Sequence, residues 1–260
     1  MEKLYIIKIG GNVIDDENKL SSFLQEFASI HGKKILVHGG GKLATRVAEA
    51  MGIPQQLIDG RRITDAETLK VITMVYAGYI NKNIVVKLQA AGCNSIGLTG
   101  ADGCLISAHK RIHPSIDYGF AGDIDAVNSS LIDLLLQQNI TPVIAPVTND
   151  SSSLLNTNAD SIAQETAKEM CKHFEVYLIY CFEKTGVLSD ASDGNSSIKK
   201  INRGYYADLK DKQIISAGMI PKLDNAFEAL AAGVQHISIG HAGDLLNLIS
   251  QQSGTSIVNE

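Results

Sequence analysis

Short apolar runs alternate with longer amphipathic segments along most of the chain. The short runs are rich in Ile, Val and Leu, which favours β-strands, and the segments between them repeat apolar residues at helical spacing. The runs that we predict as strands cover residues 4–9, 34–37, 95–98, 142–146, 176–180 and 236–239. Strands that alternate with helices in this way predict an α/β fold with a mostly parallel sheet.

Three of the predicted helices have a clear apolar face. The first follows the glycines at 39–41, the second follows Asp160, and the third follows Pro221 and ends before Gly233. Asp160 or Ser161 is the expected N-cap of the second helix, and a proline in the first turn is typical of a helix start such as that of the third. The residues expected on the buried faces are Leu43, Val47, Ala50 and Met51; Ile162, Ala163, Thr166, Ala167 and Met170; and Leu223, Ala226, Phe227, Leu230 and Ala231.

Two segments interrupt the alternation. Residues 104–127 carry β-prone residues between turn signals and are predicted as a hairpin, and residues 189–200 are polar and are predicted as an exposed loop. Neither is long enough to separate independent domains. We therefore expect a single domain over residues 1–260, with one lobe of about residues 1–160 and a second of about 161–260 sharing the sheet.

Composition and charge exclude several classes of protein. The 260 residues are 45% hydrophobic and 20% charged, with a net charge of −5, and the basic residues are scattered, so nucleic-acid binding is not expected. The apolar runs fall well short of the roughly 20 residues of a membrane-spanning helix. The start of the chain leads directly into a strand, so we expect no secretory signal and a cytoplasmic location. Cys93, Cys104, Cys171 and Cys181 are expected as reduced, mostly buried thiols.

Two glycine clusters each follow a predicted strand. They are Lys8-Ile9-Gly10-Gly11-Asn12 and His38-Gly39-Gly40-Gly41-Lys42. Glycine allows the backbone to approach a ligand closely, and the amides at the start of the next helix carry positive partial charge. Each cluster could therefore bind an anion, although glycines that only turn a strand into a helix would give the same pattern.

Neither cluster matches the common nucleotide-binding loops well. The P-loop pattern is absent. The segment Gly39-Gly40-Gly41-Lys42-Leu43-Ala44 fits the dinucleotide fingerprint G-x-G-x-x-A, and Asp59 lies about 20 residues beyond it. In that fingerprint the acidic residue ends a second apolar strand, whereas Asp59 lies in a stretch with poor strand character. We therefore disfavour a dehydrogenase.

A third polar cluster comes before the second of these helices. Asn156, Asn158 and Asp160 are spaced by two, so an extended chain would direct their side chains to one side. Loop asparagines with a capping aspartate would look similar. Lys222 lies at the start of a helix, where the helix dipole gives a cation no help, so an anionic partner explains it better.

Together these motifs resemble the amino acid kinase family over nearly the whole chain. The matching segments are Lys8-x-Gly10-Gly11-Asn12, His38-Gly39-Gly40-Gly41, Gly60-Arg61-Arg62-Ile63-Thr64, Gly119-x-x-Gly122-Asp123-x-x-x-Val127-Asn128, Asn156-x-Asn158-Ala159-Asp160 and Gly218-Met219-x-x-Lys222. The resemblance implies a three-layer αβα sandwich and points to the branch that uses ATP to phosphorylate the γ-carboxylate of N-acetyl-L-glutamate, a step of arginine biosynthesis. N-Succinylglutamate is the alternative acceptor, and a non-catalytic amino-acid-sensing module is the alternative from another class.

The resemblance also implies roles for individual residues. Lys8 and Lys222 would neutralise the transferred group, and Asp160 would orient both lysines. Gly40 and Gly41 would bind the acceptor's side-chain carboxylate, Arg62 its α-carboxylate and Asn156 its acyl amide, with acceptor binding and dimerisation in the first lobe. The residues implied for ATP, whose phosphates would carry Mg²⁺, are Gly10, Gly11, Thr185, Gly186, Val187, Leu188, Ile214, Ile215 and Ser216.

The chain departs from the family pattern in two places. After the strand at 176–180 it has Cys181-Phe182-Glu183-Lys184-Thr185-Gly186 and lacks the usual Asp. It also begins with the first strand, whereas members inhibited by arginine carry an additional N-terminal helix that joins dimers into a hexamer. We therefore expect a homodimer that is insensitive to arginine.

Overall fold

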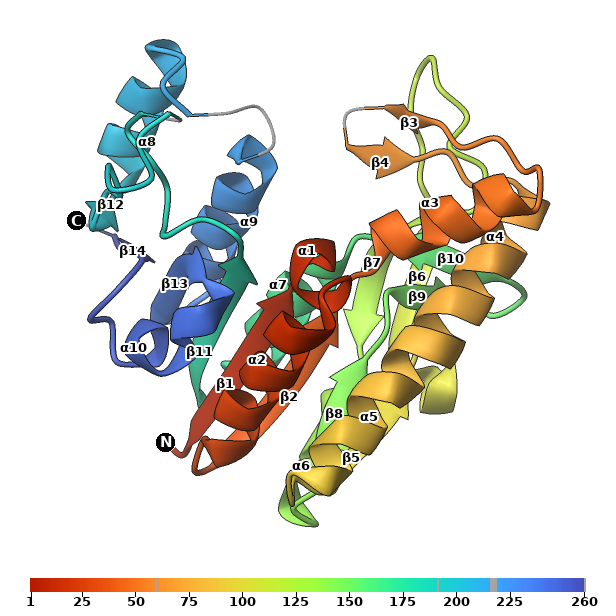
Figure 1. The fold of residues 1–260 in the computed structure, drawn as a ribbon, viewed down its shortest axis with the longest axis horizontal. Coiled ribbons are helices and arrows are strands. Elements are labelled where there is room, and N and C mark those ends of the chain that lie inside the picture. Colours follow the sequence, from red (N-terminus) through yellow and green to blue (C-terminus); the bar gives the residue numbers. More distant parts are fainter. Residues whose placement is uncertain (59, 191, 216–218, 260) are drawn as a thin grey trace.

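The computed structural model describes residues 1–58, 60–190, 192–215 and 219–259. An eight-stranded sheet forms its centre, in the order β12-β14-β13-β11-β1-β2-β8-β5 (Figure 1). Neighbouring strands are parallel except for β13 and β14. The strands are β1 (Lys3–Ile9), β2 (Lys33–His38), β5 (Ser95–Leu98), β8 (Thr141–Ile144), β11 (Glu175–Phe182), β12 (Lys200–Ile201), β13 (His236–His241) and β14 (Thr255–Ile257). All six strands expected from the sequence are present.

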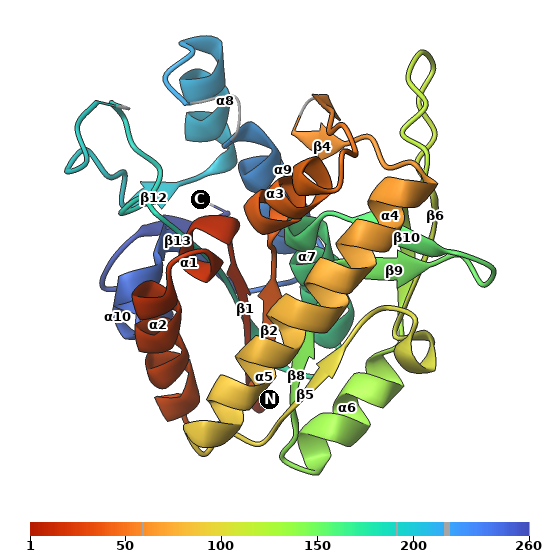
Figure 2. The same cartoon turned by 45° about the vertical axis from the view of Figure 1, so that its right-hand side comes forward.

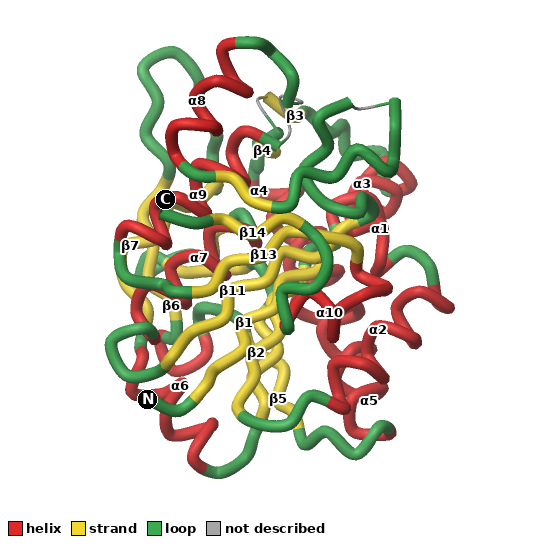
Figure 3. The backbone as a smooth tube through the Cα atoms, turned by 90° about the vertical axis from the view of Figure 1, so that its left-hand side faces the viewer, coloured by secondary structure: helices red, strands yellow, loops and turns green. Residues whose placement is uncertain are grey.

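Helices cover both faces of this sheet, so the predicted three-layer αβα architecture is confirmed (Figure 3). Successive side chains of β1 point to opposite faces: Leu4 and Ile6 join one hydrophobic cluster, and Ile7 and Ile9 join the other. The first cluster is closed by α6 (Ser129–Gln137), α7 (Ala159–Met170), α8 (Arg203–Asp211) and α9 (Ile220–Ala231). The second is closed by α2 (Glu17–Ser29), α3 (Gly41–Ala50), α4 (Ala66–Ile72), α5 (Asn81–Ala90) and α10 (Leu245–Ile249).

Some helix details were predicted wrongly. In α3 the buried residues are Ala44 and Ala48, while Ala50 and Met51 are exposed, so the buried face is turned from the one expected. In α9 the expected Ala231 is exposed. The N-cap of α7 is Asn158, whose Oδ1 accepts hydrogen bonds from the amides of Asp160 and Ser161. The asparagine performs the capping, which leaves the Asp160 carboxylate available for other contacts.

The segment between α4 and α5 is π-helical, over Thr73–Ile80, and continues both helices without a break. Figure 2 shows the combined helix α4–π–α5 lying along one side of the sheet. A π-helix widens the turn and changes which residues face inward. Here it buries Tyr76 and Ile80 against the end of β2. The sequence did not predict this segment.

Next to the sheet, four strands form a small closed barrel in the order β10-β7-β6-β9. They are β6 (Ile106–Lys110), β7 (Ala121–Val127), β9 (Val147–Asn149) and β10 (Leu154–Thr157). β6 and β7 are antiparallel, which confirms the hairpin predicted for residues 104–127. A separate two-stranded hairpin is made by β3 (Leu57–Ile58) and β4 (Arg61–Arg62), and the remaining short helices are α1 (Gly11–Ile14), η2 (Asp102–Cys104) and η3 (Ala242–Asp244).

The four cysteines are unpaired thiols, as expected, but they are not mostly buried. Cys93 and Cys181 are buried, whereas Cys171 is half-buried and Cys104 is exposed. Among the described residues, the helices are all too short or too polar to cross a bilayer.

Candidate active site

The two glycine clusters lie side by side at the carboxyl ends of β1 and β2. Ile9 is in register with His38, and the amide of Gly39 donates to the carbonyl of Ile9 at 3.1 Å. A Cβ added to Gly11 would lie 3.9 Å from the amide nitrogen of Gly41. The two strand ends therefore bring two glycine-rich loops to one place, as the pattern predicted.

Gly40 has a conformation that other residues rarely adopt. Its φ is +149°, and a Cβ there would lie 2.3 Å from Cδ1 of Ile80. Tyr76 is the next closest side chain, with ring carbons at 3.2 and 3.3 Å from the same position. Both contacts come from the π-helical segment, so this segment fixes the loop from behind and only glycine fits at residue 40.

Lys8, Asp160 and Lys222 form one ionic cluster beside these loops. The Lys8 ammonium lies 2.7 Å from Oδ1 of Asp160, and Lys222 donates a hydrogen bond to Oδ2. Lys8 comes from the end of β1, Asp160 from the first turn of α7 and Lys222 from the first turn of α9. The side chains of Lys8 and Asp160 are 11% and 12% exposed, and that of Lys222 is 23% exposed. Their predicted juxtaposition is confirmed.

In this cluster, burial opposes the charged forms of Asp160 and Lys8, and the attraction between the charges favours them. Burial alone would raise the pKa of Asp160, but the charges of Lys8 and Lys222, with their hydrogen bonds, hold it well below its usual range. Burial lowers the pKa of Lys8, and this effect exceeds the opposing attraction of Asp160. The carboxylate is therefore a fixed negative charge that accepts no proton near neutral pH, while two cations share it.

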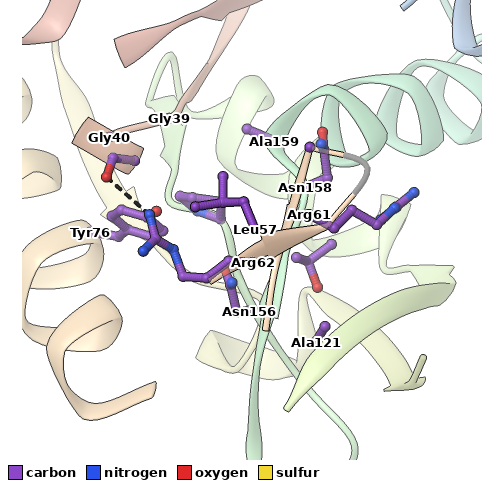
Figure 4. Close-up of a pocket in the computed structure, with 14 residues that line it drawn as sticks. Gly39, Gly40, Leu57, Arg61, Arg62, Tyr76, Ala121, Asn156, Asn158 and Ala159 are labelled. Carbon is purple, nitrogen blue, oxygen red and sulfur yellow. Dashed lines mark hydrogen bonds between the residues drawn. The ribbon is translucent and has the colours of Figure 1, made fainter. Parts of the chain in front are cut away.

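A cavity of about 170 Å³ opens next to the second glycine cluster (Figure 4). It is bounded by the two-stranded hairpin, the start of α3, the π-helix and the segment before α7. All four residues predicted for the acceptor, Gly40, Gly41, Arg62 and Asn156, line it. Its other lining residues are Gly39, Leu57, Gly60, Arg61, Tyr76, Ala121, Pro146, Thr157, Asn158 and Ala159.

Arg62 is a buried cation at this cavity, 8% exposed, and hydrogen bonds hold it in a fixed position. Its Nη2 donates to the carbonyl of Gly41 at 3.1 Å, the dashed line of Figure 4, and to Oγ1 of Thr45 at 2.8 Å. Its Nη1 donates to Oε1 of Gln55. Arg61 leaves the same strand in the opposite direction in Figure 4. The guanidinium of Arg62 is thus oriented by neutral acceptors, and its charge stays available to an anion.

The remaining motifs of the sequence hold the cavity wall together. The side-chain amide of Asn156 donates to Oγ1 of Thr64 at 3.0 Å, and the amide of Thr64 donates to the carbonyl of Tyr118 at 3.1 Å. A Cβ on Gly119 would lie 2.3 Å from the carbonyl oxygen of Thr64, so glycine is required there. The segments around residues 64, 119 and 156 are therefore one packed unit.

The residues predicted for the nucleotide are placed differently. Gly10 and Gly11 lie at the end of β1 beside the lysines. Val187 and Ile215 are buried members of the first hydrophobic cluster, and Ile214 packs against it, whereas Thr185 is exposed and Leu188 is half-buried. None of these residues lines the cavity of Figure 4. Ser216, with Gly218 of the C-terminal motif and Asp59 of the disfavoured fingerprint, lies outside the described residues.

Sequence reasoning missed several side chains that shape the site. Thr45 and Gln55 orient Arg62, Tyr76 forms a wall of the cavity, and Asn158 caps α7. No helix, strand or turn pattern indicates the first three. The N-cap could have been found, since asparagine two residues before Asp160 is among the best capping residues.

Comparison with known proteins gives consistent results. The model of the amino acid kinase family matches residues 3–241. The chain is 53% identical to the acetylglutamate kinase of Cytophaga hutchinsonii, with 99% of each chain covered, and 51% identical to that of Parabacteroides distasonis, over 99% of this chain and 100% of the relative. Among solved structures, the protein smu.665 of Streptococcus mutans superposes with a TM-score of 0.80 at 26% identity and 99% coverage of both chains.

Proposed function

Because the chain belongs to the amino acid kinase family, we propose that it uses ATP to phosphorylate the γ-carboxylate of N-acetyl-L-glutamate, the second step of arginine biosynthesis. The product is an acyl phosphate. The observation that carries this proposal is the cluster of Lys8, Asp160 and Lys222 next to two glycine loops and an arginine-lined cavity. Relatives about half identical over nearly the full length are acetylglutamate kinases, which disfavours a non-catalytic sensing module.

The cavity of Figure 4 suits the acceptor. Arg62 would bind the α-carboxylate, because a guanidinium already oriented by Gln55 and Thr45 loses little entropy when it forms two parallel hydrogen bonds. The Gly40 and Gly41 amides would bind the γ-carboxylate, and Asn156 would contact the acyl amide. This arrangement would direct the γ-carboxylate towards the lysine cluster.

Phosphorylation of a carboxylate brings two anions together, so positive charge must be present where the phosphoryl group passes. Lys8 and Lys222 would supply it, Lys8 on the acceptor side and Lys222 on the nucleotide side. Asp160 would hold the two ammonium groups apart at a fixed distance, and its low pKa means that it serves as a charge and not as a base. The proton balance is simple because the attacking γ-carboxylate is already ionised.

The nucleotide would bind beside the second lobe, taken as residues 161–260. The Gly10 and Gly11 backbone would approach its phosphates, since glycine has no side chain to keep a ligand away from the backbone. Thr185 to Leu188 and Ile214 to Ser216 would contact the base and ribose. Mg²⁺ bound to the phosphates would neutralise part of their charge.

One observation favours a second acceptor, N-succinylglutamate. Arg61 lines the cavity, and its Nη1 lies 3.8 Å from Oδ1 of Asp123, whose two oxygens already accept from Nη1 of Arg111 at 2.8 and 3.0 Å. Two guanidinium groups therefore share this carboxylate at the rim of the cavity. Burial and the charge of Arg111 both lower the pKa of Arg61. A carboxylate at the end of a longer acyl group would relieve this excess of positive charge.

A homodimer would use the outer face of the α4–π–α5 helix. Met74, Tyr79 and Val86 on this helix are 53%, 67% and 64% exposed, and exposed large apolar side chains favour association. Dimerisation through the first lobe, taken as residues 1–160, would leave the lysine cluster accessible. We also propose that the enzyme works in the cytoplasm, where its substrates are made.

The proposed function is tested by incubating the purified protein with Mg·ATP and glutamate, N-acetylglutamate or N-succinylglutamate. Acyl phosphate is trapped with hydroxylamine and ADP is measured in parallel. We expect turnover with an N-acylglutamate and none with free glutamate. Lys222→Ala should lower it by at least about 100-fold, whereas Lys70→Ala, at an exposed lysine of α4 paired with Glu67, should leave it unchanged. Absence of turnover with both acylated acids would refute the proposal, and Arg61→Ala reports which acyl group the cavity prefers.

A further inference from the structure

A chain of hydrogen bonds, buried at His38 and Asn81 and exposed at Lys82, lies directly behind the second glycine cluster. It joins His38 at the end of β2, Asn81 and Lys82 at the start of α5, and the strands β5 and β8. His38 and Asn81 are both fully buried, and neither lines the cavity of Figure 4. Buried polar groups are retained when they fix a structure that apolar residues cannot fix.

The direction of every bond in this chain can be assigned. The Lys82 ammonium can only donate, and it lies 3.1 Å from Oδ1 of Asn81 and 2.8 Å from the carbonyl of Gly97. The amide nitrogen of Asn81 therefore faces the carbonyl of Val143 at 2.9 Å and Nε2 of His38 at 3.1 Å. Nε2 must then accept, so the single proton of the neutral ring resides on Nδ1.

The Nδ1–H of His38 donates a hydrogen bond to the second glycine cluster. Nδ1 of His38 lies 2.8 Å from the carbonyl oxygen of Gly39, and it donates to this oxygen. In a trans peptide the carbonyl and the following N–H point in opposite directions. Because His38 draws the Gly39 carbonyl towards the core, the amide of Gly40 must point away from the core, on the side of the cavity. Among the described residues, none accepts a hydrogen bond from this amide.

The hydrogen-bond chain needs a glycine at residue 97, next to Asn81 and Lys82. A Cβ on Gly97 would lie 1.9 Å from Oδ1 of Asn81 and 2.8 Å from Nζ of Lys82, so any larger residue there would displace both side chains. On the side of the glycine cluster, Ile80 precedes Asn81 and blocks any Cβ at Gly40. The junction between the π-helix and α5 thus fixes the loop through one packing contact and one hydrogen bond.

We propose that His38 is a positioning residue for the acceptor: its Nδ1–H, held in that tautomer by Asn81, orients the Gly39–Gly40 peptide so that the Gly40 amide can bind the γ-carboxylate. This inference rests on the proposed function for the identity of the acceptor. The tautomer itself does not depend on it. His38 would influence the affinity for the acceptor and would leave the affinity for ATP unchanged.

Two nearly isosteric variants separate positioning from packing. In His38→Asn the side-chain amide occupies the place of Nδ1 and can still donate to Gly39, whereas in His38→Gln it occupies the place of Nε2 and cannot. We expect His38→Gln to raise the acceptor KM roughly tenfold, the effect of one lost hydrogen bond, with the ATP KM unchanged. His38→Asn should stay within about threefold of the wild type, since it keeps that bond. Equal effects of the two variants on the acceptor KM, or a shift in the ATP KM, would overturn the inference.

A second measurement needs no variant and no activity. Long-range ¹H–¹⁵N correlation spectra of the intact protein distinguish the two neutral tautomers of histidine. We expect the Nδ1–H form for His38, and the Nε2–H form would overturn the inference even if the enzyme is active. If the wild type does not phosphorylate an acylglutamate but shows the Nδ1–H form, the proposed function has failed while the hydrogen-bond chain stands.

Discussion

Replacement of Asp160 by asparagine is the sharpest test of the lysine cluster. The change keeps the shape of the side chain and removes the charge that Lys8 and Lys222 share. At 2.7 Å and an effective dielectric constant of 20, one such pair is worth about 6 kcal/mol of Coulomb attraction before hydration is counted. Removing one partner of a buried ion pair costs about 3–5 kcal/mol in practice. Because Lys222 is partly exposed, we take about 3 kcal/mol, a fall in Tm of roughly 6–12 °C for a chain of this size.

The same variant should respond to nucleotide differently from the wild type. The phosphates of ATP would restore negative charge between the two lysines, so the increase in Tm that Mg·ATP produces should be larger in Asp160→Asn. Turnover should fall by about two to three orders of magnitude, because the lysines are no longer held in place. Differential scanning fluorimetry with and without Mg·ATP, together with steady-state kinetics, measures both effects. An unchanged Tm with normal kcat would refute the reasoning.

Four further predictions follow from the same geometry. Lys222→Ala should lower kcat by at least about 100-fold while far-ultraviolet circular dichroism stays native, since a partly exposed helix start tolerates alanine. Arg62→Ala should raise the acceptor KM by about 30-fold or more with a smaller change in kcat, and a pure kcat effect in steady-state kinetics would contradict its assigned role. Tyr79→Glu should convert a dimer to a monomer on sedimentation, whereas an unchanged mass would place the interface elsewhere. Burial, opposed by the bond to Gly39 and aided by Lys82, lowers the pKa of His38 to about 4. The unfolded state therefore binds more protons than the folded state below pH 6.5, and the free energy of unfolding should fall by up to about 3 kcal/mol as the pH drops from 6.5 to 4. Urea titrations across this range should show this fall, and His38→Asn should flatten it.

Much of the fold could be predicted because parallel sheets leave strong local signals. Each central strand is an apolar run followed by a turn residue, and these runs were found within one or two residues. The meeting of Lys8 with Asp160 was implied by the resemblance to the amino acid kinase family and not by any local pattern, because the two residues lie far apart in the sequence. Features that depend on a local pattern, such as these strands, were therefore predicted well.

Apart from the N-cap of α7, the errors concern features decided by tertiary contacts. The π-helix at Thr73–Ile80 carries no local signal for a wider turn, and its Tyr76 and Ile80 pack against Gly40 far away in the sequence. The buried face of α3 was misjudged because Ala44 and Ala48 pack more closely than the larger Met51. The fixation of Arg62 by Gln55 is likewise invisible in the sequence, because it depends on a contact between two side chains that no local pattern indicates.

The position of β1 in the sheet has a consequence for biosynthesis. It pairs with β2 on one side and with β11 on the other, so its second partner is translated roughly 170 residues after it. Until then the nascent polypeptide exposes an unpaired strand edge beside apolar side chains, a state that invites aggregation and attracts chaperones. We expect the ribosome-bound N-terminal portion to remain incompletely folded until residues 175–182 have left the exit tunnel, and then both halves of the molecule to acquire their structure in a single event.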